Sequence, residues 1–173
     1  MSLFGYFVVA RSDQSLYQLP SIQRLCAESQ HDGIRPGTLV GLRADGPWQQ
    51  LQTFGGHGLD LVQLVMETEA PAMSIYVVES EFGYIDARTP AGVAWWGYLN
   101  PETAVRDYEA PDPPAPVASI ADRAVAWAVE ANRNAIRADV AAALCERVGP
   151  FGEGVDTLML ALGFRFGDQL LRD

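Results

Sequence analysis

Three short β-rich runs in the middle of the chain constrain its fold more than any other feature. They are Ile75–Glu79, Phe82–Arg88 and Val93–Leu99, and each is rich in valine, isoleucine or aromatic residues. The breaks between them, Ser80–Glu81 and Thr89–Gly92, carry turn-forming residues and are too short for anything but a reversal of the chain. The stretch therefore predicts a three-stranded antiparallel meander.

The alternation of side chains shows that neither face of this meander is polar. In the third run Val93, Trp95, Gly97 and Leu99 share one face, and Ala94, Trp96 and Tyr98 share the other. Exposed apolar patches of this size are uncommon on monomers. We therefore expect other segments of the chain to cover both faces of the sheet.

Further strands are predicted before the meander. Phe4–Ala10 reads as a buried strand, because it is aromatic or β-branched almost throughout. Thr38–Leu42 and Trp48–Phe54 flank a break that contains Asp-Gly, which is a hairpin signal. Together with the meander, these runs predict an antiparallel sheet of about five or six strands.

Helical patterns separate and follow these strands. Pro20–Ser29 and Pro101–Tyr108 begin with a proline suited to the first turn of a helix. In Leu59–Glu69 the residues Leu59, Val62, Val65 and Met66 form one apolar stripe, and Leu61 and Leu64 extend it sideways. This pattern predicts a helix that is packed centrally.

A proline-rich stretch divides the 173-residue chain into two parts of different composition. We expect a sheet-containing core at residues 1–108, a linker at 109–117, and an alanine-rich helical segment at 118–173. Three apolar stripes predict three helices in that segment, the first starting at a capping box of Ser119 and Asp122. These helices have stripes that must be buried, so we expect them to pack on the sheet. The fold class is α+β, with a single domain overall.

The charge of the chain is one-sided and limits its partners. Twelve cationic residues face 22 acidic ones, which gives a net charge of −10. Such a field repels phosphate backbones, so we expect no nucleic acid and no membrane as partners. The charge serves either solubility or the binding of a basic protein. The expected partner is another protein or a second copy of the chain.

Residue types that the sequence lacks exclude several kinds of chemistry. Lysine is absent, which removes a Schiff-base lysine, a P-loop lysine and a Ser–Lys pair. Neither HExxH nor a CxxC pair is present, and we predict neither a metal nor another cofactor. Cys26 and Cys145 are far apart in the sequence, and we expect both to be reduced in a cytoplasmic protein.

One glycine-rich turn is a candidate ligand site. Gly55, Gly56, His57 and Gly58 precede the predicted helix at Leu59. Glycines let backbone N–H groups approach a ligand, and the N-terminus of a helix favours anions. The turn lacks the spacing of a GxGxxG fingerprint, however. The alternative interpretation is a strand-to-helix turn that needs positive φ angles.

Aromatic and acidic residues of the meander are the other candidates. Trp96 and Tyr98 are predicted to bind a partner, since aromatic residues are enriched at binding hot spots; core packing is the alternative. Glu79, Glu81 and Asp86 cluster near the first meander turn, where a carboxylate pair is one interpretation and solvated charges at a hairpin end are the alternative. Asp86 also shares a strand face with Arg88, which predicts an ion pair between them. His31 reads as a solvated loop residue.

Two functional hypotheses follow. The first is a non-catalytic protein-binding or regulatory module that uses acidic surface and exposed aromatic residues. The alternative is a small-molecule-binding protein or enzyme that uses the turn at Gly55–Gly58, and the sequence leaves catalysis open. The two differ in whether His57 and the aromatic residues line one pocket.

Overall fold

The computed structural model describes residues 2–27 and 36–167, and within these ranges it contains six strands and six α-helices. The strands are β1 (Gly5–Arg11), β2 (Thr38–Asp45), β3 (Trp48–Phe54), β4 (Ala72–Val78), β5 (Phe82–Arg88) and β6 (Ala94–Leu99). The helices are α1 (Pro20–Cys26), α2 (Leu61–Thr68), α3 (Pro101–Tyr108), α4 (Val117–Glu130), α5 (Arg137–Leu144) and α6 (Glu153–Ala161).

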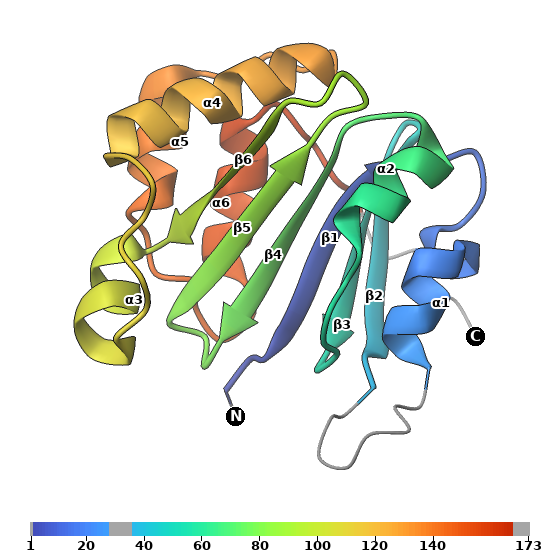
Figure 1. The fold of residues 1–173 in the computed structure, drawn as a ribbon, viewed down its shortest axis with the longest axis horizontal. Helices are drawn as coiled ribbons and strands as arrows, with labels where there is room; N and C mark the ends of the chain where they lie inside the picture. The colour runs from blue at the N-terminus through green and yellow to red at the C-terminus, as the bar shows by residue number, and fades with distance from the viewer. Residues whose placement is uncertain (1, 28–35, 168–173) are drawn as a thin grey trace.

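The strands form one antiparallel sheet in the order β2-β3-β1-β4-β5-β6 (Figure 1). This confirms the predicted α+β fold and its antiparallel sheet of five or six strands. The meander is present as β4, β5 and β6, paired in sequence order. The N-terminal strand β1 lies in the middle, between β3 and β4.

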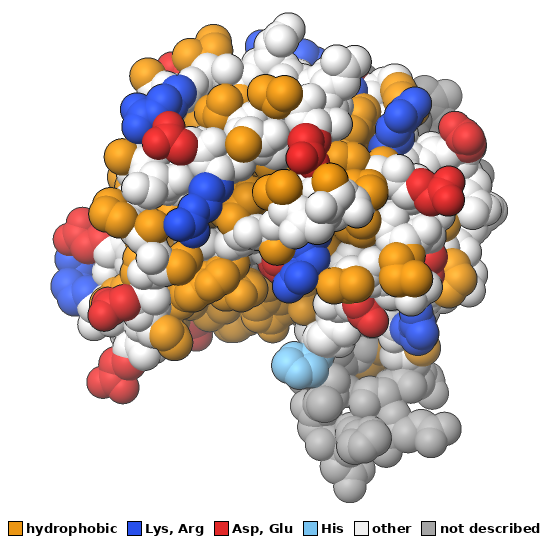
Figure 2. All heavy atoms as spheres, turned by 45° about the horizontal axis from the view of Figure 1, so that its top comes forward, with side chains coloured by type: hydrophobic (Ala, Val, Ile, Leu, Met, Phe, Trp, Pro, Cys, Tyr) orange, Lys and Arg blue, Asp and Glu red, His pale blue; other side chains and the backbone are white. Residues whose placement is uncertain are grey.

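Helices α1, α2 and α3 pack on one surface of the sheet and leave part of it open. Residues of α1 and α2 share an apolar cluster with the strands, which includes Val8, Leu51 and Leu64. Helix α3 packs at the other side of the same surface, beside Phe82 and Tyr98. Between α2 and α3 the surface of β4, β5 and β6 is uncovered (Figure 1), and Figure 2 shows hydrophobic side chains gathered in the hollow there.

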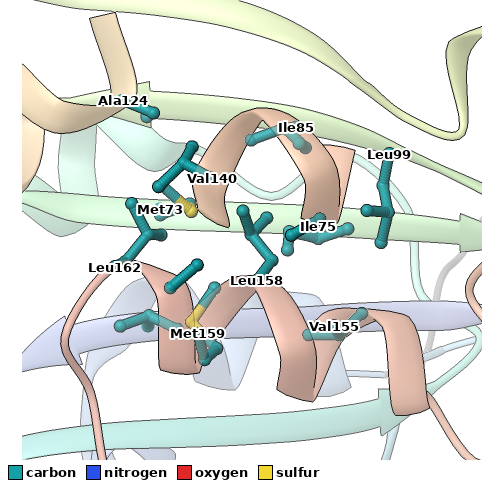
Figure 3. Packing of buried hydrophobic residues seen from close by; sticks show 14 of the residues in the cluster. Met73, Ile75, Ile85, Leu99, Ala124, Val140, Val155, Leu158, Met159 and Leu162 are labelled. Carbon is teal, nitrogen blue, oxygen red and sulfur yellow. The ribbon is translucent and has the colours of Figure 1, made fainter. Parts of the chain in front are cut away.

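Helices α4, α5 and α6 cover the opposite surface of the sheet (Figure 1). Strand residues such as Met73, Ile75 and Ile85 belong to one buried cluster with Val140 of α5 and Leu158 of α6 (Figure 3). Burying apolar surface of this kind contributes roughly 25 cal/mol per Å². Both sheet faces therefore contribute to apolar cores, as the two-sided pattern of the meander requires.

The connection between β4 and β5 ties distant parts of the chain together. Ser80 is buried, with a φ angle of 61°. Its Oγ accepts a hydrogen bond from the Leu3 N–H at 2.6 Å, and its own N–H donates to the Leu3 carbonyl at 3.0 Å. Its carbonyl accepts from the Gly149 N–H at 2.9 Å. The N-terminus, the meander and the helical segment thus meet at one residue.

Helix α4 begins earlier than the sequence predicts. Pro116 occupies its N-cap position, and the Pro116 carbonyl accepts hydrogen bonds from the N–H groups of Ser119 and Ile120. Ser119 therefore lies inside the helix, and the predicted capping box is wrong; the Asp122 carboxylate instead pairs with Arg137. Among residues 2–27 and 36–167, no helix is long and apolar enough to cross a membrane.

The two cysteines are free thiols with different exposure. Cys145 is exposed, whereas Cys26 is half-buried and packs beside the cluster under α1. Burial raises the pKa of the Cys26 thiol, so less of the reactive thiolate is present at neutral pH.

We expect a thiol reagent such as Ellman's to modify two groups in the native protein in two phases. Cys145 reacts first because it is exposed, and Cys26 reacts second because its thiolate is scarce and shielded. Mass spectrometry of the digested protein identifies which cysteine each phase modifies. Fewer than two reactive thiols in the denatured, unreduced chain, or Cys26 reacting first, contradicts this expectation.

Candidate functional site

Five aromatic side chains lie on the surface of the sheet that α1, α2 and α3 partly cover. We call this surface the aromatic face; its members are Tyr6, Tyr76, Tyr84, Trp96 and Tyr98. Strand register aligns the four tyrosines in one row across β1, β4, β5 and β6, because Tyr6 faces Tyr76, Tyr76 faces Tyr84, and Tyr84 faces Tyr98. Of the five, only Trp96 and Tyr98 were candidates from the sequence.

Ring contacts divide the aromatic face into two groups. The rings of Tyr6 and Tyr76 have centroids 4.9 Å apart. Tyr84 stacks on Trp96 at 5.5 Å with an interplanar angle of 28°, and Trp96 meets the edge of Tyr98 at 5.6 Å. Such pairs contribute beyond the area they bury.

The members of the aromatic face differ in what they offer a partner. Tyr84 is 40% exposed and Trp96 is half-buried, so both present ring surface to solvent. Tyr98 is only 5% exposed, and its hydroxyl donates a hydrogen bond to the Pro111 carbonyl at 2.8 Å. Tyr98 therefore contacts Trp96 from the side along β6, and Trp96 with Tyr84 forms the accessible part.

A charged pair adjoins the aromatic face on β5. Arg88 Nε lies 3.4 Å from Asp86 Oδ1, which confirms the ion pair predicted from their spacing. Asp86 faces Ser74 on β4 and Trp96 on β6. Burial raises the pKa of Asp86, and the positive charge of Arg88 opposes that shift. A partly buried carboxylate thus lies beside Trp96 and Arg88 on this surface.

A cavity of about 600 Å³ continues this surface toward α2. It is lined by Val62, Val65, Met66 and Glu69 on one side and by residues between Arg88 and Ala94 on the other. Ala94 precedes Trp96 by two positions on β6, and Arg88 follows Tyr84 by four positions on β5, so each shares a strand face with a member of the aromatic face. The cavity and the aromatic face therefore form one continuous surface.

The sequence did not predict which side of α2 lines this cavity. Leu61, Leu64 and Val65 are buried, whereas Val62 and Met66 are exposed. The expected stripe through Val62 and Met66 is therefore wrong in its angular position. The helix is apolar over most of its circumference, and tertiary packing selects the side that is buried.

The glycine-rich turn lies at the edge of the aromatic face. Gly55, Gly56 and Gly58 have φ angles of 70°, 92° and 70°, which glycine adopts without strain. His57 is exposed, and the cavity beside α2 is lined by neither His57 nor Trp96. The turn meets the tyrosine row at Tyr6, whose hydroxyl accepts a hydrogen bond from the Leu59 N–H at 3.4 Å.

Helix α2 supplies its own acceptor where an anion was expected. It begins at Leu61, three residues after Gly58, and the Asp60 carboxylate caps it by accepting from the Gln63 N–H at 2.9 Å. A capping carboxylate already accepts a hydrogen bond from the free N–H groups at the helix N-terminus and places a negative charge there, as a bound anion would. A ligand site at Gly55–Gly58 therefore stays a prediction from the sequence.

The remaining candidate acids are dispersed. Glu79 accepts a hydrogen bond from the Tyr108 hydroxyl, and Glu81 pairs with Arg147. Asp86 lies within β5 and pairs with Arg88, so it does not share a partner with Glu79 or Glu81. Within the described part of the chain, no group of three His, Cys, Asp or Glu side chains is placed to hold a metal ion. His31 lies outside the described residues.

Comparisons with protein-family models, curated proteins and solved structures give no match to this chain. Its function is therefore argued from the geometry of the aromatic face and the adjoining cavity.

Proposed function

We propose that this chain is a non-catalytic protein-binding module whose partner binds across the aromatic face and the adjoining cavity. The stacked pair of Tyr84 and Trp96 carries the proposal, because Tyr84 is 40% exposed and Trp96 is only half-buried. Tyrosine and tryptophan are enriched among the residues that dominate binding energies, since they bury a large area at low entropic cost.

The shape of the surface favours an extended protein segment over a small molecule. Small ligands usually bind in concave pockets that enclose most of their surface. Here Tyr84 is 40% exposed on the sheet surface, and the cavity lies beside Ala94, two residues before Trp96 on β6. Val62 and Met66 of α2 are exposed at that end, and methionine adapts readily to the shape of a partner.

The alternative, a small-molecule site or enzyme at the glycine-rich turn, lacks a comparable observation. A small-molecule site would place His57 and the aromatic residues in one pocket, whereas a protein-binding module would not require this. The cavity nearest to the aromatic face includes Glu69 and Arg88 but not His57. This arrangement supports the binding-module hypothesis.

A selection from a random peptide library displayed on phage tests the proposal. We expect the immobilised full chain to enrich peptides that bind it specifically. Replacing both rings, in the double variant Tyr84→Ala and Trp96→Ala, is expected to weaken the selected peptides at least about tenfold, because hot-spot truncations cost more than about 1.4 kcal/mol. Binding is measured by calorimetric titration.

The matched control is Val129→Ala, which truncates an exposed apolar residue of α4 on the other side of the sheet. Melting temperatures of all variants establish that they are folded. The proposal fails if no peptide is enriched, or if the selected peptides bind the double variant as tightly as the unchanged chain.

A further inference from the structure

One acidic residue, Asp86, lies next to both aromatic groups. Tyr76 and Tyr84 are directly opposite in register, yet each ring contacts a different neighbour: Tyr76 contacts Tyr6, and Tyr84 contacts Trp96. Asp86 follows Tyr84 by two residues on the same strand face and lies diagonal to Tyr76 across β4. Its carboxylate therefore borders both groups.

The electrostatics of the tyrosines agree with this placement. The negative charge of Asp86 contributes to the raised pKa of both Tyr6 and Tyr84, although burial is the larger cause for each. One carboxylate thus acts on a ring from each aromatic group.

We propose that the position between these groups, which we call the Asp86 slot, binds the guanidinium group of an arginine side chain from the partner protein. This inference rests on the proposed function and adds the chemistry of the partner. A guanidinium is planar, stacks on aromatic faces and donates paired hydrogen bonds to a carboxylate. Aromatic rings beside a carboxylate match all three properties.

The neighbouring Arg88 leaves this carboxylate only partly satisfied. Its Nε approaches one oxygen, Asp86 Oδ1, at 3.4 Å, longer than the 2.7–2.9 Å typical of a charge-assisted bond. Among the described residues, Arg88 Nε has no hydrogen-bond partner. An ionised carboxylate offers about four acceptor positions. The side chain of Asp86 is 24% exposed, so an incoming donor can reach it.

The charges around the slot favour a cation. Besides Asp86, this surface includes Glu69 at the cavity and Asp112, whose negative charge acts on Tyr98. Arg88 is the cation of the slot itself, and the whole chain has a net charge of −10. This field draws a basic segment toward the aromatic face and opposes an acidic one.

The cavity predicts a second feature of the partner segment. Asp86 and Arg88, two residues apart on β5, are separated by about 7 Å at the usual rise of a strand. The apolar side chains Val62, Met66 and Val93 line the cavity beside Arg88. An extended partner segment with an arginine in the slot would therefore place an apolar side chain in the cavity about two residues away.

The test uses two capped peptides, Ala-Arg-Ala-Leu-Ala and the same peptide with citrulline in place of arginine. Citrulline keeps the shape but lacks the charge. We expect the arginine peptide to shift the Trp96 indole NMR signal of the full chain, and the citrulline peptide to bind at least tenfold more weakly. Asp86→Asn is expected to weaken the arginine peptide to a similar extent.

The control variant Glu130→Gln removes one negative charge from the exposed end of α4 and is expected to change binding less than twofold. The inference is overturned if both peptides bind the unchanged chain equally, a comparison that needs no variant to fold. It is also overturned if Asp86→Asn and Glu130→Gln weaken the arginine peptide equally. Such a result would mean that the overall negative charge of the chain attracts the peptide.

The outcome separates this inference from the proposed function. If phage selection yields peptides that depend on Tyr84 and Trp96 but contain no arginine, the binding module stands and the Asp86 slot fails. If the arginine peptide binds through Asp86 while selection yields nothing, the slot stands as a guanidinium site and the protein-binding function fails.

Discussion

A chain that ends at Glu109 is expected to lose its cooperative fold, because one surface of its sheet would lose all its covering helices. That surface includes Val9, Met73, Ile75 and Ile85, each at most 1% exposed in the full chain. They share one buried cluster with α4, α5 and α6. Exposing a continuous apolar surface of this kind favours aggregation or collapse to a loosely packed state.

Polar contacts would be lost together with the apolar cover. Arg133 Nη1 donates to Asp45 Oδ2 at 2.9 Å, and the same guanidinium lies over the rings of Trp48 and Phe164. The Asn100 N–H donates to the Leu144 carbonyl at 2.8 Å. Asp45 and Asn100 lie at opposite ends of the sheet order, beside β2 and β6. The helical segment therefore holds the sheet at both sides.

The measurement is thermal unfolding followed by near-ultraviolet circular dichroism, with binding of the dye ANS to report exposed apolar surface. Residues 1–109 alone are expected to bind ANS and to show no cooperative transition. Co-expression with residues 110–173 as a separate chain is the control. It is expected to restore cooperative unfolding and to abolish ANS binding. A fragment that melts cooperatively without binding ANS would instead mean that the sheet is an independent domain.

The local pattern of the sequence predicts the strands well but not how distant strands pair. Tyr84 and Tyr98 lie on adjacent strands of one meander, and their alignment depends on a short turn. Tyr6 joins the same row only because β1 lies beside β4, a pairing that no turn between neighbouring strands fixes. The full aromatic face was therefore beyond sequence reasoning, although Trp96 and Tyr98 pointed to it.

Two other differences have physical reasons of the same kind. Helix α2 is apolar on most sides, so periodicity could not decide between burying Leu64 and burying Met66. At α4, Pro116 occupies the N-cap position, so Ser119 already lies within the helix and its hydroxyl does not cap it. Where two local signals compete, tertiary contacts decide the outcome.

The carboxylates illustrate a limit of spacing arguments. Asp86 and Arg88 share a strand face, and the ion pair follows directly from a side-chain period of two. Glu79 and Glu81 are equally close to each other in sequence, yet Glu79 binds Tyr108 of α3 and Glu81 binds Arg147, which follows α5. Spacing predicts contacts within a strand, whereas contacts at its ends depend on the elements that pack there.

Trp127→Ala is expected to be the most damaging single substitution in the helical layer. Trp127 is fully buried, and its ring lies 6.2 Å from that of Trp48 and 6.1 Å from that of Phe164. Removing a buried aromatic side chain costs about 3–5 kcal/mol, through lost contacts and the cavity left behind. That is a large part of the stability of a typical domain.

The hydrogen bond of Trp127 connects this core to the candidate site. Its Nε1–H donates to the carbonyl of Arg88 at 3.1 Å, and the Arg88 side chain lies on the opposite sheet surface beside Asp86. Trp127→Phe keeps most of the apolar contact but leaves that carbonyl without its partner, at a cost of about 1–3 kcal/mol. The two substitutions therefore separate packing from the hydrogen bond.

Urea unfolding of the full chain measures both free energies, with Val129→Ala on the exposed side of α4 as the control. That control is expected to change the free energy of unfolding by no more than about 0.5 kcal/mol, as surface substitutions usually do. A loss below about 1 kcal/mol for Trp127→Ala contradicts the central position of this residue. Weaker peptide binding by Trp127→Phe at temperatures where it is fully folded would show that the helical layer also positions β5 for the partner.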